Sequence, residues 1–378
     1  MMTNRNTWRY ARVMLCSLVS LLCVASYPLF AQGRVNVSDE LSPTHMKAAV
    51  ALEKGNPRDV LIILQGMNDH NASLLRGMAR FDLREYAAAA RDLSGYRRGI
   101  SSRYAYLDQE EKDIYYDALN TLMLAYYHSD QLAESLEVSE ELMQIKYSRD
   151  IMEFQSKVRR EMTGSGTRLS EASDHFKVIY DGYEHGKVDR KVLSILEAAY
   201  RETGRQMDYF PSSPITVVLD TSGQFHDITQ SPRWAGGVFK DGRIRIPVGG
   251  LETFNESEVR RVLNHEYVHA LIYSITANCP RWVHEGMAEY FSRGPASISG
   301  RPQLPLRALE GAFYSNDVRA VAFAYMDSYR AINALIERYG LYEIKLYLEA
   351  LAAGQQEEEA FRFRFHISYD EFIDKFGG

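Results

Sequence analysis

The sequence is poor in cysteine, with three among 378 residues, and two of these, Cys16 and Cys23, lie within the first 31 residues. If those residues are removed on export, only Cys279 remains, which excludes a disulfide within the mature chain. A protein of this length can rely on a hydrophobic core for its stability instead. We expect the remaining thiol to be a buried small side chain rather than a metal ligand.

Long hydrophobic runs are also scarce. The apolar run at residues 13–25 is shorter than the ~20 residues that a membrane-spanning helix needs. It follows three arginines and precedes Ala31, a small residue at a possible cleavage point. The pattern predicts a signal peptide over residues 1–31 and a periplasmic or secreted protein without a membrane span. A membrane anchor is the alternative.

Positive charge is in deficit. The sequence has 44 lysines and arginines and 50 acidic residues, so the formal net charge is −6. Loss of the three arginines of the predicted signal would change this to 41 − 50 = −9. A mildly acidic protein is poorly suited to nucleic acid or to an anionic membrane surface. We expect neither as a partner.

Proline is absent between Pro57 and Pro211. Apolar residues recur at helical spacing through much of this interval, in two helix-turn-helix units at residues 74–93 and 122–142 that each break at a short polar turn. Residues 44–162 are therefore predicted to form an all-helical domain.

The helical half resembles tetratricopeptide repeats. Gly77, Tyr86, Ala89 and Leu93 have the spacing of the small, aromatic, small and large positions of that family. The second unit follows after about 46 residues instead of ~34, so the stretch between the units would be an insertion or an extra helix. The resemblance implies a concave surface that binds a protein partner or substrate. An unrelated helical bundle is the alternative.

The pattern changes after the candidate linker at residues 164–166. Strands are expected at residues 176–180 and 215–219, and a hairpin with an Asp-Gly turn is expected at residues 237–247. Pro247 would end its strand or confine it to a sheet edge. The chain is helical again from Asn255 onward. The fold class is therefore α+β, with a helical domain followed by a domain of small sheet and helices over residues 172–378.

Two histidines stand four residues apart in the sequence NHEYVHA, residues 264–270. A capping-box pattern at residues 255–258 predicts the start of a helix that carries them. On that helix His265 and His269 share one face, and imidazole is a good ligand for zinc. Glu266 would accept a proton from the attacking water. An ordinary helix with three polar residues is the alternative, although such a stripe suits a dry core poorly.

A catalytic zinc site usually has three protein ligands, and the segment PRWVHEGMAEYF at residues 280–291 offers candidates for the third. HEYVHA followed by this segment resembles the gluzincin, thermolysin-like metallopeptidases of the peptidase MA superfamily. The resemblance implies that Glu285 is the third zinc ligand and that Glu289 holds the far ring nitrogen of His265. We expect His284 to be a surface residue that points away.

Further features of this half are less specific. Gly286 costs a helix about 1 kcal/mol relative to alanine, which a close approach to the helix bearing His265 would explain. The chemistry needs a donor to the oxyanion, and Tyr325 and Tyr329 are the candidates, with simple packing as the alternative. By analogy, the strand at residues 243–246 would form the edge of the cleft, where a peptide could add as a further strand.

The sequence therefore predicts an exported zinc metallopeptidase whose helical half recruits a partner or substrate. The aminopeptidase signature GxMEN is absent, which favours an endopeptidase. Two alternatives remain. One is a non-catalytic adaptor with a zinc-binding metallopeptidase fold, and the other is a zinc hydrolase of a non-peptide amide in the cell wall.

Overall fold

A computed structural model of the chain describes residues 42–163, 168–181, 188–229, 236–249, 255–294, 302–315 and 317–372. The chain divides into two compact units at Gly164 and Ser165, and each unit has its own hydrophobic core. The predicted signal peptide at residues 1–31 lies outside the described residues. Within the described ranges, no helix combines the length and the apolar character needed to cross a membrane.

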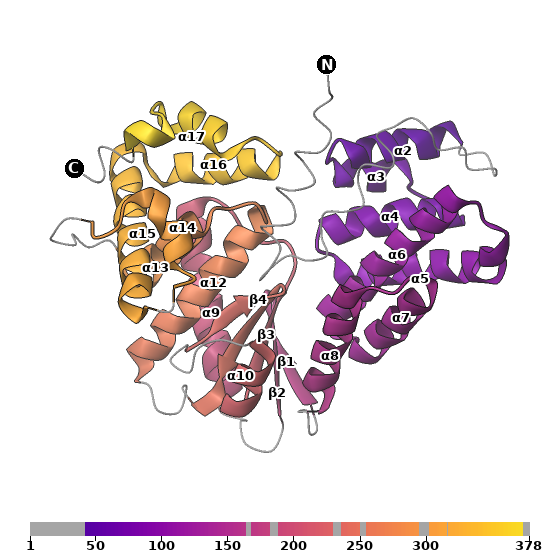
Figure 1. Cartoon of the computed structure of the whole chain (residues 1–378), viewed down its shortest axis with the longest axis horizontal. Coiled ribbons are helices and arrows are strands. Elements are labelled where there is room, and N and C mark those ends of the chain that lie inside the picture. The colour runs from indigo at the N-terminus through magenta and orange to yellow at the C-terminus, as the bar shows by residue number, and fades with distance from the viewer. Residues whose placement is uncertain are drawn as a thin grey trace. The chain divides into compact units, whose positions relative to one another are not determined.

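The first unit is helical (Figure 1). Its helices are α2 (Pro43–Glu53), α3 (Pro57–Ile63), α4 (His70–Asp82), α5 (Tyr86–Ile100), the 3-10 helix η2 (Ser101–Tyr106), α6 (Gln109–His128), α7 (Leu132–Ile145) and α8 (Arg149–Thr163). Both predicted turns are confirmed, between α4 and α5 and between α6 and α7. Each turn contains a residue with positive φ, Arg84 or Asp130, which reverses the chain direction within three residues.

A close contact between α4 and α5 depends on Gly77. A Cβ atom at this position would lie 2.6 Å from Leu93 Cγ, so only glycine lets the two helices approach this closely. Residues 94–113 lie between the two predicted helix-turn-helix units. They do not form an independent helix, because they consist of the end of α5, η2 and the start of α6. The tetratricopeptide interpretation stays a prediction.

The second unit contains a mixed five-stranded sheet with the order β1-β2-β3-β5-β4. Its strands are β1 (Arg168–Ala172), β2 (Phe176–Asp181), β3 (Ile215–Asp220), β4 (Val238–Lys240) and β5 (Arg243–Pro247). The three inner strands are parallel, and β1 and β4 pair antiparallel at the two edges. This small sheet beside many helices confirms the α+β class, although β1 was not among the expected strands.

The expectation that a peptide could add as a strand to residues 243–246 is wrong, because β5 lies between β3 and β4 and pairs with both. Arg243 and Arg245 on this strand are buried. Arg245 Nη1 lies 2.8 Å from a carboxylate oxygen of Asp220 on β3, and such pairing is what allows a charge to be buried. Pro247 does end the strand, and β4 is the edge strand on this side of the sheet.

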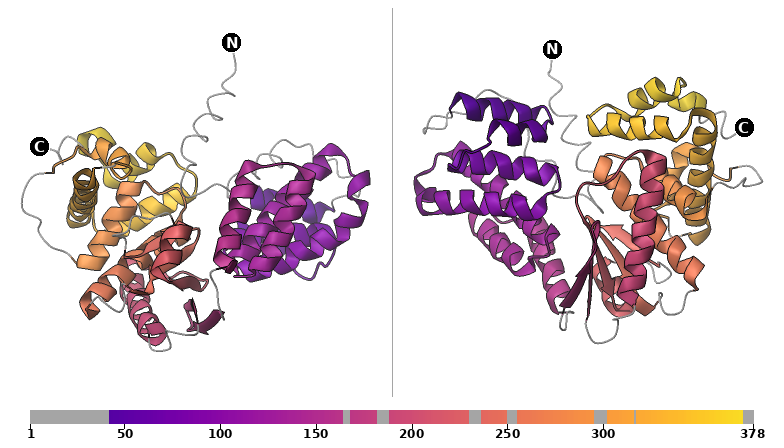
Figure 2. Two further views of the ribbon diagram at one scale, coloured as in Figure 1. Left: turned by 60° about the horizontal axis from the view of Figure 1, so that its bottom comes forward. Right: turned by 180° about the vertical axis from the view of Figure 1, so that it is seen from behind.

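Helices make up the rest of the second unit (Figures 1 and 2). They are α9 (Val188–Met207), α10 (Ser222–Thr229), α12 (Glu256–Ile275), α13 (Arg281–Arg293), α14 (Leu306–Ala312), α15 (Val318–Tyr339), α16 (Leu341–Ala352) and α17 (Glu357–Phe365). Helix α12 contacts α9, β4 and β5, and it also contacts α13, which packs in turn on α15. The central position of α12 brings its polar residues between the sheet and α13.

Candidate metal centre

The start of α12 is fixed by the predicted capping box, which is confirmed. The Asn255 side chain accepts a hydrogen bond from the Glu258 N–H, and the Glu258 carboxylate accepts one from the Asn255 N–H. The helix then continues without interruption to Ile275. One turn apart on it, the rings of His265 and His269 have their centroids 4.8 Å apart, so both imidazoles can reach one point.

Glu285 on α13 completes a triangle with these two histidines. The two Nε2 atoms lie 3.1 Å apart, and Glu285 Oε2 lies 3.4 Å from that of His265 and 3.3 Å from that of His269. Tetrahedral zinc with bonds of about 2.0–2.1 Å separates its ligand atoms by about 3.3 Å. The separations of the three ligand atoms therefore fit a zinc ion held by these residues.

The donor set and the burial also fit a cation. Two imidazole nitrogens and one carboxylate oxygen are ordinary zinc ligands. Glu285 Oε2 is buried and makes no well-formed hydrogen bond within the described residues, which is costly for a carboxylate unless a positive partner compensates it. The neighbouring His269 and His265 hold the pKa of Glu285 well below its usual range despite its burial. Among the described residues, these three side chains form the group that could hold a metal ion.

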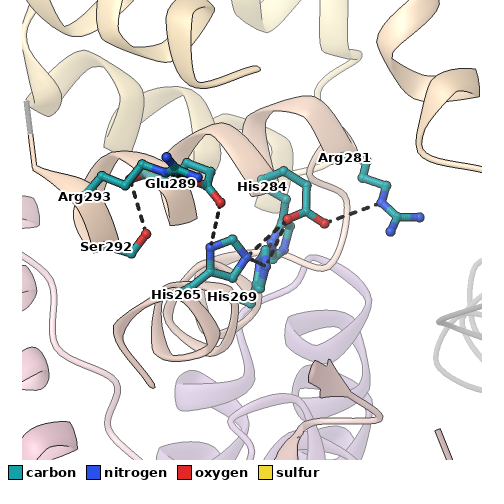
Figure 3. A network of polar contacts seen from close by, with 8 residues as sticks. His265, His269, Arg281, His284, Glu289, Ser292 and Arg293 are labelled. Carbon is teal, nitrogen blue, oxygen red and sulfur yellow. Dashed lines mark hydrogen bonds and ion pairs between the residues drawn. The ribbon is translucent and has the colours of Figure 1, made fainter. Parts of the chain in front are cut away.

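The outer atoms of two ligands have partners on α13 as well (Figure 3). Glu289 Oε1 lies 3.5 Å from His265 Nδ1, on the far side of the ring from Nε2, and Glu289 also forms an ion pair with Arg293. This is the arrangement that the resemblance implied for Glu289. Arg281 Nε lies 3.5 Å from Glu285 Oε1, the carboxylate oxygen that the triangle does not use.

The expectation that His284 points away is wrong. His284 Nδ1 lies 2.7 Å from His269 Nδ1, and the two ring centroids are 4.9 Å apart. Burial, followed by the neighbouring His269, lowers the pKa of His284 to about 3, so its ring is neutral near pH 7. The sequence gives no signal for this contact, because His284 and Glu285 are adjacent and yet both contact His269 on α12.

Glu266 is buried beside the histidines, and burial raises its pKa. The backbone N–H of Phe239 on β4 donates a hydrogen bond to it. Just before that strand, a Cβ atom on Gly237 would lie 2.9 Å from Glu266 Cγ, so glycine makes room for the carboxylate. A buried carboxyl with a raised pKa suits proton transfer near neutral pH. No sequence signal pointed to either contact with β4.

The two candidate oxyanion donors are in different surroundings. The Tyr325 ring centroid lies 6.3 Å from that of His265, and burial followed by Glu285 raises the pKa of this tyrosine, which keeps it protonated. Tyr329 is 2% exposed, and its hydroxyl donates to the carbonyl of Gly294 at 2.9 Å. Tyr325 therefore lies beside the candidate metal centre, whereas Tyr329 stabilises the C-terminal end of α13 through its hydrogen bond to Gly294.

Gly286 permits a close approach, but the expected neighbour was wrong. A Cβ atom at this position would lie 2.4 Å from the carbonyl oxygen of Ser328 on α15. The contact is therefore between α13 and α15 rather than between α13 and α12. It sets the position of α13, and with it the position of the adjacent Glu285.

Residues 198–372 match the family model of the Peptidase MA superfamily. The second unit contains a peptidase MA-like domain. Peptidases of this superfamily typically depend on zinc, and the matched segment includes the whole His265, His269 and Glu285 triangle. The match supports a peptidase-like enzyme and does not extend to the helical first unit. No curated protein matches the chain.

Proposed function

We propose that the protein is an exported, zinc-dependent metallopeptidase of the gluzincin type that hydrolyses peptide bonds with activated water. The observation that carries the proposal is the triangle of His265 Nε2, His269 Nε2 and Glu285 Oε2, with sides of 3.1 to 3.4 Å. A buried carboxyl, Glu266, follows the first ligand directly. The match of the domain to the Peptidase MA superfamily supports the same activity.

The roles of the residues follow from their positions. A zinc ion held by the triangle would supply a Lewis acid that polarises the substrate carbonyl and activates water. Glu266 accepts the proton from the water and passes it to the leaving amine. Tyr325 donates a hydrogen bond to the oxygen on which negative charge develops. Glu289 holds the ring of His265, which keeps the Nε2 of that ring directed at the cation.

The β4 edge is the proposed binding position of the peptide. This strand is at one end of the sheet, and its Phe239 N–H contacts Glu266. An extended peptide that adds to a free strand edge gains main-chain hydrogen bonds. A peptide bound along β4 would therefore pass the proposed base, which suits cleavage within a chain and supports an endopeptidase.

The first unit is proposed to recruit a protein partner or the substrate. Support comes from its helical hairpins and from the close α4–α5 packing at Gly77, both of which suit a repeat array with an extended binding face. Export is proposed from the signal-like pattern of residues 1–31.

The proposal is tested by metal analysis together with a digestion assay. Zinc content is measured by mass spectrometry, and casein and a peptide library are incubated with wild type, Glu266→Gln and Glu256→Gln. Glu256 is an exposed glutamate on the same helix, which makes it the matched control. We expect one zinc per chain in all three proteins, and cleavage by wild type and Glu256→Gln only.

The other outcomes decide between the alternatives. Zinc binding without cleavage of any peptide or wall fragment would favour the adaptor. Cleavage of wall amides but not of peptides would favour a hydrolase of the cell wall. Activity that survives in Glu266→Gln would remove the proposed mechanism.

A further inference from the structure

Helix α13 carries an outer partner for each of the three ligands. Glu289 contacts His265, Arg281 contacts Glu285, and His284 contacts His269. The third contact is the shortest of the set, with 2.7 Å between the two Nδ1 atoms. Figure 3 shows His284 beside His269. The resemblance assigns no role to His284, which makes this contact the one without an explanation.

Hydrogen-bond chemistry limits the form that this contact can take. At 2.7 Å, one Nδ1 must carry a hydrogen and the other must accept it. A neutral imidazole has its hydrogen on one nitrogen only. If His269 Nε2 presents its lone pair to a cation, the hydrogen of His269 is on Nδ1, and His284 Nδ1 must be the acceptor.

We propose that His284 is a positioning residue that accepts a hydrogen bond from His269 Nδ1 and thereby directs His269 Nε2 toward the metal ion. The inference rests on the proposed zinc site. Groups that hold the far nitrogen of a metal-binding histidine fix its tautomer and ring orientation, and their loss typically costs about 10- to 100-fold in metal affinity. Glu289 acts on His265 through a carboxylate, and His284 acts on His269 through a neutral ring.

Replacing the acceptor tests the idea. His284→Phe keeps a ring of similar size without an acceptor. His284→Asn keeps an acceptor, because the amide oxygen is attached at the same position along the side chain as Nδ1. His366→Asn is the control, since His366 is an exposed histidine of the same unit whose φ of 52° asparagine tolerates.

The zinc Kd of each full-length protein is measured by competition with a chromophoric chelator. We expect His284→Phe to raise the Kd by about 10- to 100-fold. His284→Asn should remain within a few-fold of wild type, and His366→Asn should not change. Equal Kd values for wild type and His284→Phe would overturn the proposal.

Nitrogen-15 NMR of the histidine rings supplies a second readout, which covers the case in which His284→Phe does not fold. In zinc-loaded wild type we expect the ring hydrogen of His269 on Nδ1, protected from solvent exchange, with faster exchange in the phenylalanine variant. A hydrogen on Nδ1 of His284 would contradict the assignment. If wild type binds no zinc, the proposed function fails as well. If wild type binds zinc and His284→Phe matches it in zinc Kd and in ring-hydrogen exchange, this inference alone fails.

Discussion

Replacement of Gly286 by alanine should damage the metal centre through helix packing, without touching a ligand. The added Cβ would lie 2.4 Å from Ser328 O and 2.6 Å from Ile332 Cγ1, and ordinary contact begins at 3.4 Å. The backbone oxygen cannot turn aside as a flexible side chain can. Helices α13 and α15 would therefore have to separate by about 1 Å, a movement of the size that makes overpacked cores destabilising.

The expected effects on stability and on metal binding differ in size. Alanine gains about 1 kcal/mol over glycine in a helix, whereas overpacking costs about 1–3 kcal/mol, so the net loss of unfolding free energy is between about 0 and 2 kcal/mol. A metal site tolerates errors of about 0.2 Å in ligand distance. Because Glu285 is the adjacent residue, we expect zinc affinity to fall by at least about 10-fold, as for other losses of ligand positioning.

The assay pairs chelator competition for zinc with urea unfolding of the zinc-free protein. Gly311→Ala is the control, because its Cβ would meet nothing within 4 Å. The reasoning is refuted if Gly286→Ala binds zinc as wild type does and gains stability as the control does. In that case the contact with α15 would not position the ligand.

Four further substitutions, at Tyr325, Tyr329, Gly237 and Asp117, have expected outcomes. Tyr325→Phe should lower kcat by about 10²- to 10³-fold with unchanged zinc affinity. Tyr329→Phe should instead lower Tm and leave kcat nearly unchanged. Kinetics and melting curves that show the reverse would exchange the roles of the two tyrosines. Gly237→Ala should displace the general base Glu266 and lower kcat while zinc stays bound. Gly223→Ala is the control, because its Cβ would meet nothing within 4 Å. Equal kcat values for Gly237→Ala and wild type would contradict the packing argument. Burial raises the pKa of Asp117 from 3.8 to about 6, so the folded state binds this proton more tightly and the contribution of this carboxyl to stability rises as pH falls from about 6 to about 4. Asp117→Asn should therefore have a higher Tm than wild type at pH 7, and the difference in Tm should vanish near pH 4. A difference that stays constant between these pH values would contradict the raised pKa of Asp117.

The parts of the site that depend on local spacing could be predicted from the sequence. A four-residue interval brings His265 and His269 to one helix face, and a capping box fixes where that helix begins. The turns of the helical half were predictable for the same reason, because polar residues interrupt an apolar period.

The parts that depend on packing between distant elements could not be predicted. The neighbour of Gly286 is on α15, a helix far along the chain. The inner position of β5 results from its pairing with both β3 and β4, which brings Arg245 to Asp220 on β3. The contact between His284 and His269 depends on how α13 lies against α12. A single sequence states which residues are available, but not which helix or strand will face them.

The central claim is that three side chains on two consecutive helices hold one zinc ion. Anomalous diffraction at the zinc edge, from crystals of the zinc-loaded full-length protein, tests it most directly. We predict one strong peak at about 2.0–2.2 Å from His265 Nε2, His269 Nε2 and Glu285 Oε2. A peak elsewhere, or a carboxylate of Glu285 turned away from a metal held by the two histidines, would contradict the account.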